Sequence, residues 1–455
     1  MSTHIANGSS HLSMWLRVRE FAVPPSMIET ATARRRSGDW AGACSAARFD
    51  LDLDLRSVAR VHGREPTARI RADLRRLAPD LLRWHMPRVA PHGLLRPGLT
   101  VSLARYEVPG RDGDQPVHLV ARTAPAWADA GQRISLALWD GSRASRSDEA
   151  ARRHPHARPN RRFRLDLHRH LWDADRADEL RARSGADLPP GDGPRRAADR
   201  WAAEAALLLH AEGRADGAVT VRLAARERLL LELVTGAGGQ GPPVPRVWQA
   251  PPHRGLSALP VLPDAATWEL PDLELLRAGL IGADALHPLV AAALVPDHVP
   301  SGSSRTADVA GAPHHVECRG ARHRIGLVDG VLSALDHGPD ELRREELLVA
   351  LTGTPLPCLR AIDTAHREPH CLTGVRERLR HGDVAGGLAV VEGLLGPGAV
   401  LRSGALKDEL AAAARRRITY GLFRAGLYGP GRDRIRPAEP RPVTHRSHPR
   451  HTTGR

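Results

Sequence analysis

Between residues 99 and 172 the apolar side chains recur at every second position, and this alternation limits the fold more than any other feature of the chain. The segments TVSLARYEV, VHLVART, RISLALW and RFRLDLH show it, with turn-rich stretches between them. Because side chains on a strand point alternately to opposite faces, the pattern predicts strands with one buried face. Turn-rich connections between such strands favour an antiparallel sheet.

Helical spacing is found on both sides of these strands. Residues 26–90 predict a helical hairpin and a further helix interrupted near Pro79, following a short strand at 15–23. Residues 197–235 predict one helix and a β-hairpin, and the glycine- and proline-rich residues 235–255 predict a long loop. We therefore expect an α+β protein with a mixed N-terminal region at 14–296.

A polar segment rich in serine and glycine, 297–313, is the predicted linker to a second unit. Residues 314–427 predict a β-meander followed by a small helical bundle, and Asp329-Gly330 has the sequence of a type I′ hairpin turn. The last residues, 428–455, combine prolines and arginines without apolar periodicity and are predicted to be a disordered basic tail.

Two Gly-Asp pairs, Gly38-Asp39 and Gly382-Asp383, lie in closely similar helical surroundings. Glycine accepts the left-handed conformation that ends a helix, and aspartate accepts hydrogen bonds from the free N–H groups of the next helix. Each pair therefore predicts a corner between two helices. Strands are expected between the two copies, so a continuous helical repeat is excluded.

The chain has a formal net charge of +14, with 66 basic and 52 acidic residues, and Lys407 is its single lysine. The preference for arginine over lysine is typical of a GC-rich bacterial gene. Clustered arginines can neutralise phosphates, so nucleic-acid binding is one hypothesis. Its candidate residues are Arg152, Arg153, Arg158, Arg161, Arg162 and Arg164. Aromatic residues make up only 4%, which argues against platforms for base stacking.

The short catalytic motifs in the chain have neighbouring residues that are incompatible with the structures these motifs need. The segment GAGGQG at 236–241 matches a dinucleotide-binding pattern, but PPVP follows where a helix would have to begin. Lys407 follows a leucine within a helix-like segment, which excludes a P-loop, and no G-x-S-x-G is present. We assign no catalytic residue and lean against an enzyme, with a site assembled from dispersed residues as the alternative.

Two groups of residues are candidate metal ligands. Asp50, Asp52 and Asp54 alternate along a predicted strand and share one face, where they fit either a cation or a solvent-exposed edge. The other group is Cys358, His366, His370 and Cys371, in which Pro369 interrupts the helix that would align the two histidines. We predict surface aspartates, surface histidines and buried thiols, with no metal and no other cofactor.

The four cysteines form no C-x-x-C pair, and the N-terminus has no apolar signal or membrane-spanning segment. This favours the reducing cytoplasm, with Met1, Met14 and Met27 as candidate start residues. The sequence as a whole predicts a cytoplasmic bacterial module that binds another protein and has no membrane contact. Nonspecific nucleic-acid binding through an arginine-rich surface is the alternative, and a motif-free enzyme is a third hypothesis.

Overall fold

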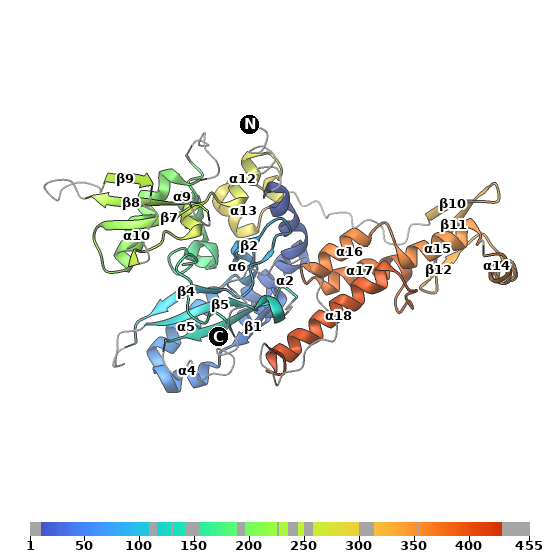
Figure 1. The fold of residues 1–455 in the computed structure, drawn as a ribbon, viewed down its shortest axis with the longest axis horizontal. Helices are drawn as coiled ribbons and strands as arrows, with labels where there is room; N and C mark the ends of the chain where they lie inside the picture. Colours follow the sequence, from blue (N-terminus) through green and yellow to red (C-terminus); the bar gives the residue numbers. More distant parts are fainter. Residues whose placement is uncertain are drawn as a thin grey trace.

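The computed structural model describes residues 11–108, 116–128, 131–141, 154–188, 196–224, 227–234, 244–249, 258–299, 314–353 and 355–429. In Figure 1 the strands and helices of the N-terminal region lie on the left, and an elongated C-terminal unit extends away from them to the right. The fold is of the α+β class, as predicted from the alternation of periods. In the described part of the chain, no helix is long and apolar enough to cross a bilayer.

The first sheet has the strand order β1-β6-β5-β4. Its strands are β1 (Phe49–Asp52), β4 (Thr100–Tyr106), β5 (Val117–Thr123) and β6 (Ile134–Trp139), and a small hairpin, β2 (Arg88–Val89) with β3 (Leu94–Leu95), lies beside it. The pairs β4–β5 and β5–β6 are antiparallel, as predicted, whereas β1 runs parallel to β6. The fourth predicted strand, 162–168, is absent, because these residues form turns with one isolated bridge between Arg164 and Ser102.

Helices from both ends of the N-terminal region cover this sheet and share its core. They are α2 (Pro25–Arg36), α3 (Trp40–Ala46), α4 (Leu55–His62), α5 (Arg64–Arg76), α6 (Pro79–His85), α9 (Leu180–Ser184), α12 (Pro271–Arg277) and α13 (Pro288–Leu294), with the short turns η2 (Ala126–Ala128), η3 (Arg169–Leu171), η4 (Ala174–Glu179) and η7 (Ala283–Ala285). The predicted interruption near Pro79 is confirmed, since α5 ends at Arg76 and α6 begins at Pro79.

The predicted strand at 15–23 is wrong. Residues 11–17 are helical and continue into a π-helical turn, η1 (Val18–Ala22). Met14, Val18, Phe21 and Ala22 are buried. Their spacing of four, three and one residues is that of a helix face, which the run of apolar residues concealed in a short window.

A second core forms around the sheet β7-β8-β9. It is built from η5 (Ala198–Arg200), α10 (Trp201–Ala211), β7 (Gly217–Arg222), β8 (Arg228–Val234), β9 (Val244–Gln249) and α11 (Asp264–Thr267). The helix and the hairpin of 197–235 are as predicted. The third strand, β9, lies inside the stretch predicted to be a loop, where the prolines and glycines outweighed the short apolar segment.

Glu204 on α10 connects this core to the first one. Its carboxylate is 4% exposed and accepts hydrogen bonds from Nε and Nη2 of Arg183, both at 2.8 Å, while Nε2 of His168 lies 3.1 Å away. Burial alone would raise the pKa of this carboxyl, but His168 and Arg183 lower it to about 2.

We expect Glu204→Gln to remove part of the acid sensitivity of the protein. The folded-state pKa lies below the unfolded one, so the ionised carboxylate stabilises the fold above pH 4.5, and this contribution is lost as the pH falls towards 2. The contribution is about 3 kcal/mol, since each unit of pKa difference is worth about 1.4 kcal/mol. Urea unfolding of wild type and variant at several pH values measures it, and parallel pH dependences of the two proteins would contradict the assignment.

The C-terminal unit begins with the antiparallel meander β10 (His314–Cys318), β11 (Ala321–Val328) and β12 (Val331–Ala334). Five helices follow: α14 (Pro339–Thr352), α15 (Pro357–Arg367), α16 (Leu372–Arg380), α17 (Val384–Leu395) and α18 (Ala405–Arg424). Asp329 and Gly330 both have positive φ, at 49° and 78°, which confirms the predicted turn. Residues 300–313 of the predicted linker and 430–455 of the predicted tail lie outside the described residues.

Both predicted Gly-Asp corners are confirmed. Gly38 and Gly382 have φ of 81° and 84°, and the carboxylates of Asp39 and Asp383 accept hydrogen bonds from the N–H three residues later. The second corner lies against the first sheet, because Nη2 of Arg48 contacts Asp383 at 2.9 Å and Nη1 of Arg48 donates to the carbonyl of His381. The C-terminal unit is thereby joined to the N-terminal region at its α16–α17 end.

Candidate metal centre

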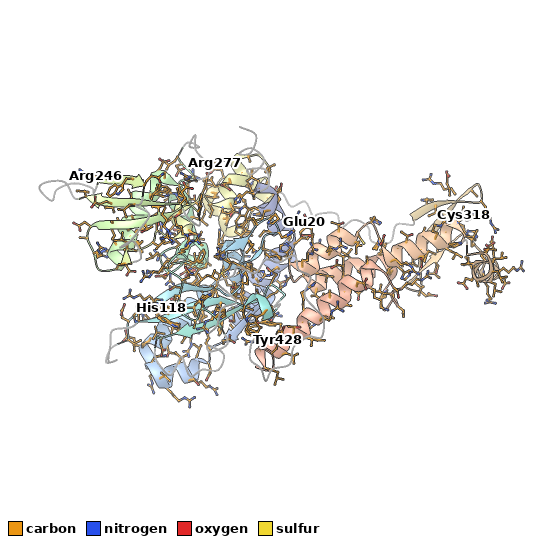
Figure 2. All side chains as sticks on the ribbon, in the orientation of Figure 1. Glu20, His118, Arg246, Arg277, Cys318 and Tyr428 are labelled. Atoms are coloured by element: carbon orange, nitrogen blue, oxygen red, sulfur yellow. The ribbon has the colours of Figure 1, made fainter. Side chains whose placement is uncertain are left out.

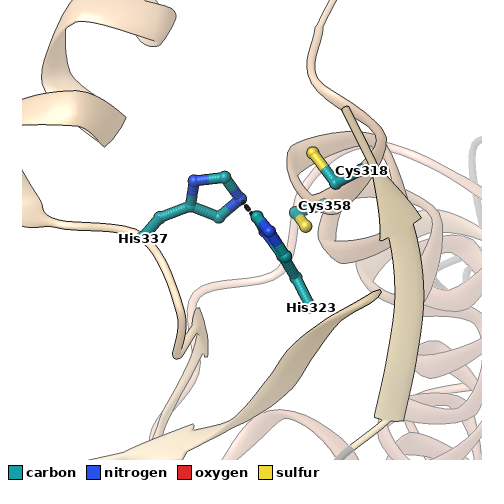
Figure 3. Close-up of side chains that lie close together, drawn as sticks. All are labelled: Cys318, His323, His337 and Cys358. Atoms are coloured by element: carbon teal, nitrogen blue, oxygen red, sulfur yellow. Dashed lines mark hydrogen bonds between the residues drawn. The ribbon is translucent and has the colours of Figure 1, made fainter. Parts of the chain in front are cut away.

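Two cysteines and two histidines converge at the far end of the C-terminal unit, where β10, β11 and β12 lie beside α15 (Figures 1 and 3). One ligand atom from each of Cys318, His323, His337 and Cys358 lies within 4.8 Å of the corresponding atom of every other member. The rings of His323 and His337 touch, with Nδ1 of the first 2.6 Å from Nε2 of the second. Among the described residues, no other group of three or more such side chains meets this criterion.

The β10–β11 turn brings the first two ligands together. Arg319 and Gly320 have positive φ, at 54° and 78°, and they close a tight hairpin in which Cys318 pairs with Ala321 and His323 pairs with Val316. Residues directly opposite each other in an antiparallel pair lie on the same face, as do residues two apart. Cys318 and His323 therefore share the face that carries the buried side chain of Ile325.

The other two ligands come from the ends of neighbouring elements. His337 follows β12 closely, and Cys358 is the second residue of α15, after Pro357 at the first position. A helix N-terminus stabilises negative charge, so this position favours a thiolate. The hydrophobic core formed by Ile325, Leu356 and Ile362 packs around both sulfurs.

Burial makes two adjacent thiols unfavourable as thiolates unless a cation accompanies them. Cys318 and Cys358 are fully buried, and His337 is 7% exposed. Burial raises the pKa of the Cys358 thiol to about 11, and the neighbouring Cys318 contributes to this rise. A bound divalent cation reverses this effect, because it deprotonates the thiols that coordinate it.

A second layer of contacts orients the histidines. Nδ1 of His337 lies 3.3 Å from Oε2 of Glu341 in the first turn of α14, which leaves Nε2 facing His323. A carboxylate on the outer nitrogen of a ligating histidine fixes its ring and raises its basicity. Next to the site, Arg324 donates to Asp336 and holds the pKa of that carboxyl at about 2.

The donor set fits zinc. Two thiolates and two imidazoles are typical of tetrahedral Zn²⁺, whereas Ca²⁺ and Mg²⁺ take oxygen ligands. Tetrahedral ligands at the usual Zn–S and Zn–N lengths lie about 3.3–3.8 Å apart. Binding an ion would therefore move the two imidazole nitrogens apart by about 0.7 Å from their 2.6 Å separation, and would close the widest separation, at most 4.8 Å, by about 1 Å.

Of the residues proposed from the sequence as metal ligands, only Cys358 lies in this cluster. His366 is eight residues further along α15, a rise of about 12 Å, and Cys371 lies at the start of α16. His370 is exposed beside Pro369, between the two helices. Cys318, His323 and His337 were missed. The available signal was Cys-x₄-His across an Arg-Gly turn, with both residues on the apolar face of a strand pair.

The three aspartates of the other proposed group are held by different partners. Asp50 accepts hydrogen bonds from Arg133 at 3.0 Å and from the hydroxyl of Tyr420. Burial raises the pKa of Asp50, but Arg133 and Tyr420 outweigh it and lower the value overall.

Asp52 binds Arg424, with Nη1 2.7 Å from Oδ2. The predicted strand ends at Asp52, so Asp54 instead caps α4 through the N–H groups of Arg56 and Ser57. The structure therefore does not bring the three carboxylates to one ion.

A pocket of about 40 Å³ lies where Asp52 meets α18. Its lining includes Asp52, Arg122, Arg133, His154, Tyr420 and Arg424. Such a volume holds water but no substrate of the size of a metabolite.

The arginines proposed for nucleic-acid binding are partly committed to ion pairs. Arg162 makes two hydrogen bonds to Asp264, at 3.0 and 2.7 Å, and Arg164 contacts both Asp166 and Glu212. Arg158 and Arg161 are exposed. Arg152 and Arg153 lie outside the described residues.

No family model, no curated protein and no solved structure matches this chain. Its function is therefore inferred from the donor set and the geometry of the cluster.

Proposed function

We propose that the C-terminal unit is a zinc-stabilised module that presents α14 to a protein partner. The observation that carries the metal part is the convergence of four nitrogen and sulfur donors, all within 4.8 Å of one another. Four protein ligands complete a tetrahedral shell and leave no position for water or substrate, so the role is structural. The reducing cytoplasm is the compartment in which such thiols stay available as ligands.

Zinc analysis of the purified full chain tests the site. We expect one zinc per chain in the wild type and its loss in Cys358→Ser, because the remaining three ligands bind far more weakly. Cys371→Ser is the matched control, since this half-buried cysteine lies outside the cluster, and it should keep its zinc. A wild type without zinc, or a Cys371→Ser variant that loses it equally, would overturn the proposal.

The partner-binding part rests on α14. Its C-terminal half exposes Leu347, Leu348 and Leu351, at 65%, 46% and 84%. Two of its acids are held near the metal cluster: Glu341 contacts His337 and Arg319, and Glu345 contacts Arg319. The exposed leucines fit a helix that lays its apolar side in a hydrophobic groove, and Glu346 next to them is the acid that a basic side chain at the rim of the groove would contact.

We expect Leu347→Asp with Leu351→Asp to weaken partner binding by more than about 10-fold, since each exposed leucine buries apolar area in a groove. The partner recovered by cross-linking from lysate should be lost in this variant and after zinc chelation. Ile418→Asp, a 63% exposed position on α18, is the control and should retain it. A partner that all variants keep would contradict docking on α14. If the wild type self-associates in sedimentation and the α14 variant does not, the protein that binds α14 is a second copy of this chain.

A further inference from the structure

The sheet β7-β8-β9 lies beside α10 (Figure 1), and its two faces carry different side chains. Val219, Val221, Leu231 and Leu233 point to one side and pack with α10 in the second core. Side chains alternate along strands, and the register therefore places Arg222, Arg228, Arg246 and Trp248 together on the opposite side. We call these four residues the arginine face.

The arginine face concentrates like charge. Arg222 and Arg228 are directly opposite each other across β7 and β8, an arrangement that destabilises an antiparallel pair unless a counter-charge is present. Arg246 on β9 is exposed and labelled in Figure 2. Nε of Arg222 donates to the backbone carbonyl of Ala224 at 3.4 Å and not to a carboxylate. Glu232, opposite Arg246, is the acid that the register places on the same side.

Further arginines raise the positive potential beside this face. Burial lowers the pKa of Arg222, and the charges of Arg162 and of its cross-strand partner Arg228 lower it further. Arg96 lowers the pKa of Arg222 as well, whereas the carboxylate of Asp264 acts in the opposite direction. Asp264 is itself bound to Arg162. The surroundings therefore do not neutralise the Arg222–Arg228 pair.

An exposed aromatic ring extends the charged surface. Trp248 is 41% exposed on β9, and its cross-strand neighbour Leu230 lies between it and Thr220 of β7. Thr220 is only 2% exposed, so the accessible part of this row lies over β8 and β9. An exposed tryptophan there can stack on an unpaired base, whereas the bases of a duplex are already stacked on one another. Arginines at neighbouring register positions supply the contacts for phosphates.

We propose that the arginine face binds single-stranded nucleic acid, with phosphates on Arg222, Arg228 and Arg246 and a base stacked on Trp248. The charge and the aromatic ring together favour this ligand over an acidic peptide, which would use the arginines but not the stacking surface. This site is separate from the metal cluster and does not depend on it. It also differs from the arginine run at 152–164, where Arg162 and Arg164 are held in ion pairs.

Fluorescence anisotropy of the full chain with a labelled mixed-sequence strand of about 10–20 nucleotides tests the proposal. Arg222→Ala with Arg228→Ala should weaken binding at least about 10-fold and reduce the slope of log affinity against log salt by about 1.4, for two lost phosphate contacts. Trp248→Ala should weaken binding by about 5- to 100-fold. Arg246→Ala changes only an exposed side chain and serves as a second variant that leaves the core intact.

The matched control is Arg71→Ala with Arg75→Ala, two exposed arginines on α5. Both double variants reduce the formal charge from +14 by two, to +12. Because both double variants change the net charge equally, the control measures the loss of long-range attraction alone. This loss should change the affinity by less than about twofold. Equal losses of affinity in both double variants would show that the strand is attracted by net charge alone and would overturn the proposed site. Absence of binding by the wild type, or equal affinity for an acidic peptide, would also overturn the proposal.

Discussion

Removing zinc from the purified full chain should unfold the tip of the C-terminal unit and leave the N-terminal cores intact. Structural zinc sites contribute about 10–16 kcal/mol of apparent binding free energy, which exceeds the stability of a small unit. The core beneath the site contains few large side chains, with Ile325, Leu356 and Ile362 as its buried aliphatic residues. Without the ion, the ligands from the meander are no longer joined to Cys358 on α15. The thiols and imidazoles then stay next to one another without a cation.

Hydrogen exchange with and without a zinc chelator measures this effect. Amides of β10, β11, β12 and the first turns of α15 should lose protection after chelation and regain it when zinc, but not magnesium, is added. Strands β4 and β5 of the first sheet are the internal control and should be unchanged. His337→Ala should reproduce the chelated state in the presence of zinc, and full protection of the meander in that variant would contradict a structural metal.

The metal cluster also shows how far local sequence patterns reach. The meander and its Asp329-Gly330 turn were predictable, because hairpin geometry is decided by a few adjacent residues. The cluster was not, since its ligands lie at 318, 323, 337 and 358 and come from separate parts of the unit. A search for ligands close together in sequence selects Cys358, His366, His370 and Cys371, of which the fold uses only the first at the site.

The strand predicted at 162–168 is absent for a related reason. Its alternation is that of a strand, but Arg162, Arg164 and Asp166 are held by side-chain contacts to other segments and to each other. Bidentate arginine–carboxylate pairs satisfy these groups without a strand partner. Similarly, the alternation with leucines predicts a strand at Asp54, whereas its carboxylate accepts hydrogen bonds from the N–H groups of Arg56 and Ser57 and begins α4. Capping chemistry outweighed the alternation there.

Gly-Asp corners, in contrast, were predicted correctly at both places, and the two copies share more than the pair itself. In each, the glycine follows an arginine by four residues and the aspartate precedes a second glycine by three: Arg34, Gly38, Asp39 and Gly42 in one copy, and Arg378, Gly382, Asp383 and Gly386 in the other. In both, the aspartate N–H donates to the arginine carbonyl and the guanidinium returns to the carboxylate. Hydrogen bonds between neighbouring residues are sufficient to form this corner. It can therefore be predicted from the local sequence without knowledge of the tertiary packing.

The two corners differ in their surroundings, and this provides a matched pair of substitutions. Asp39 and Arg34 are largely exposed, with side chains 40% and 59% accessible. Asp383 is 7% exposed and also binds Arg48 of the N-terminal region. We expect Asp39→Ala to cost about 1 kcal/mol, the usual value for a lost helix cap. Asp383→Ala should cost about 3–5 kcal/mol, because it also leaves the half-buried guanidinium of Arg48 without its carboxylate.

Hydrogen exchange of the helices at each corner measures the loss of local stability in each variant. It needs no assumption that the whole chain unfolds in one step. Asp383→Ala should lower protection in α16, α17 and the segment around Arg48, whereas Asp39→Ala should act on α2 and α3 alone. A double variant, Arg48→Met with Asp383→Ala, should recover part of the loss because the unpaired charge is gone. Equal effects of the two single substitutions would show that Arg48 contributes nothing to the joint, and the C-terminal unit would then be held to the first sheet by the contacts of α18 with Asp50 and Asp52.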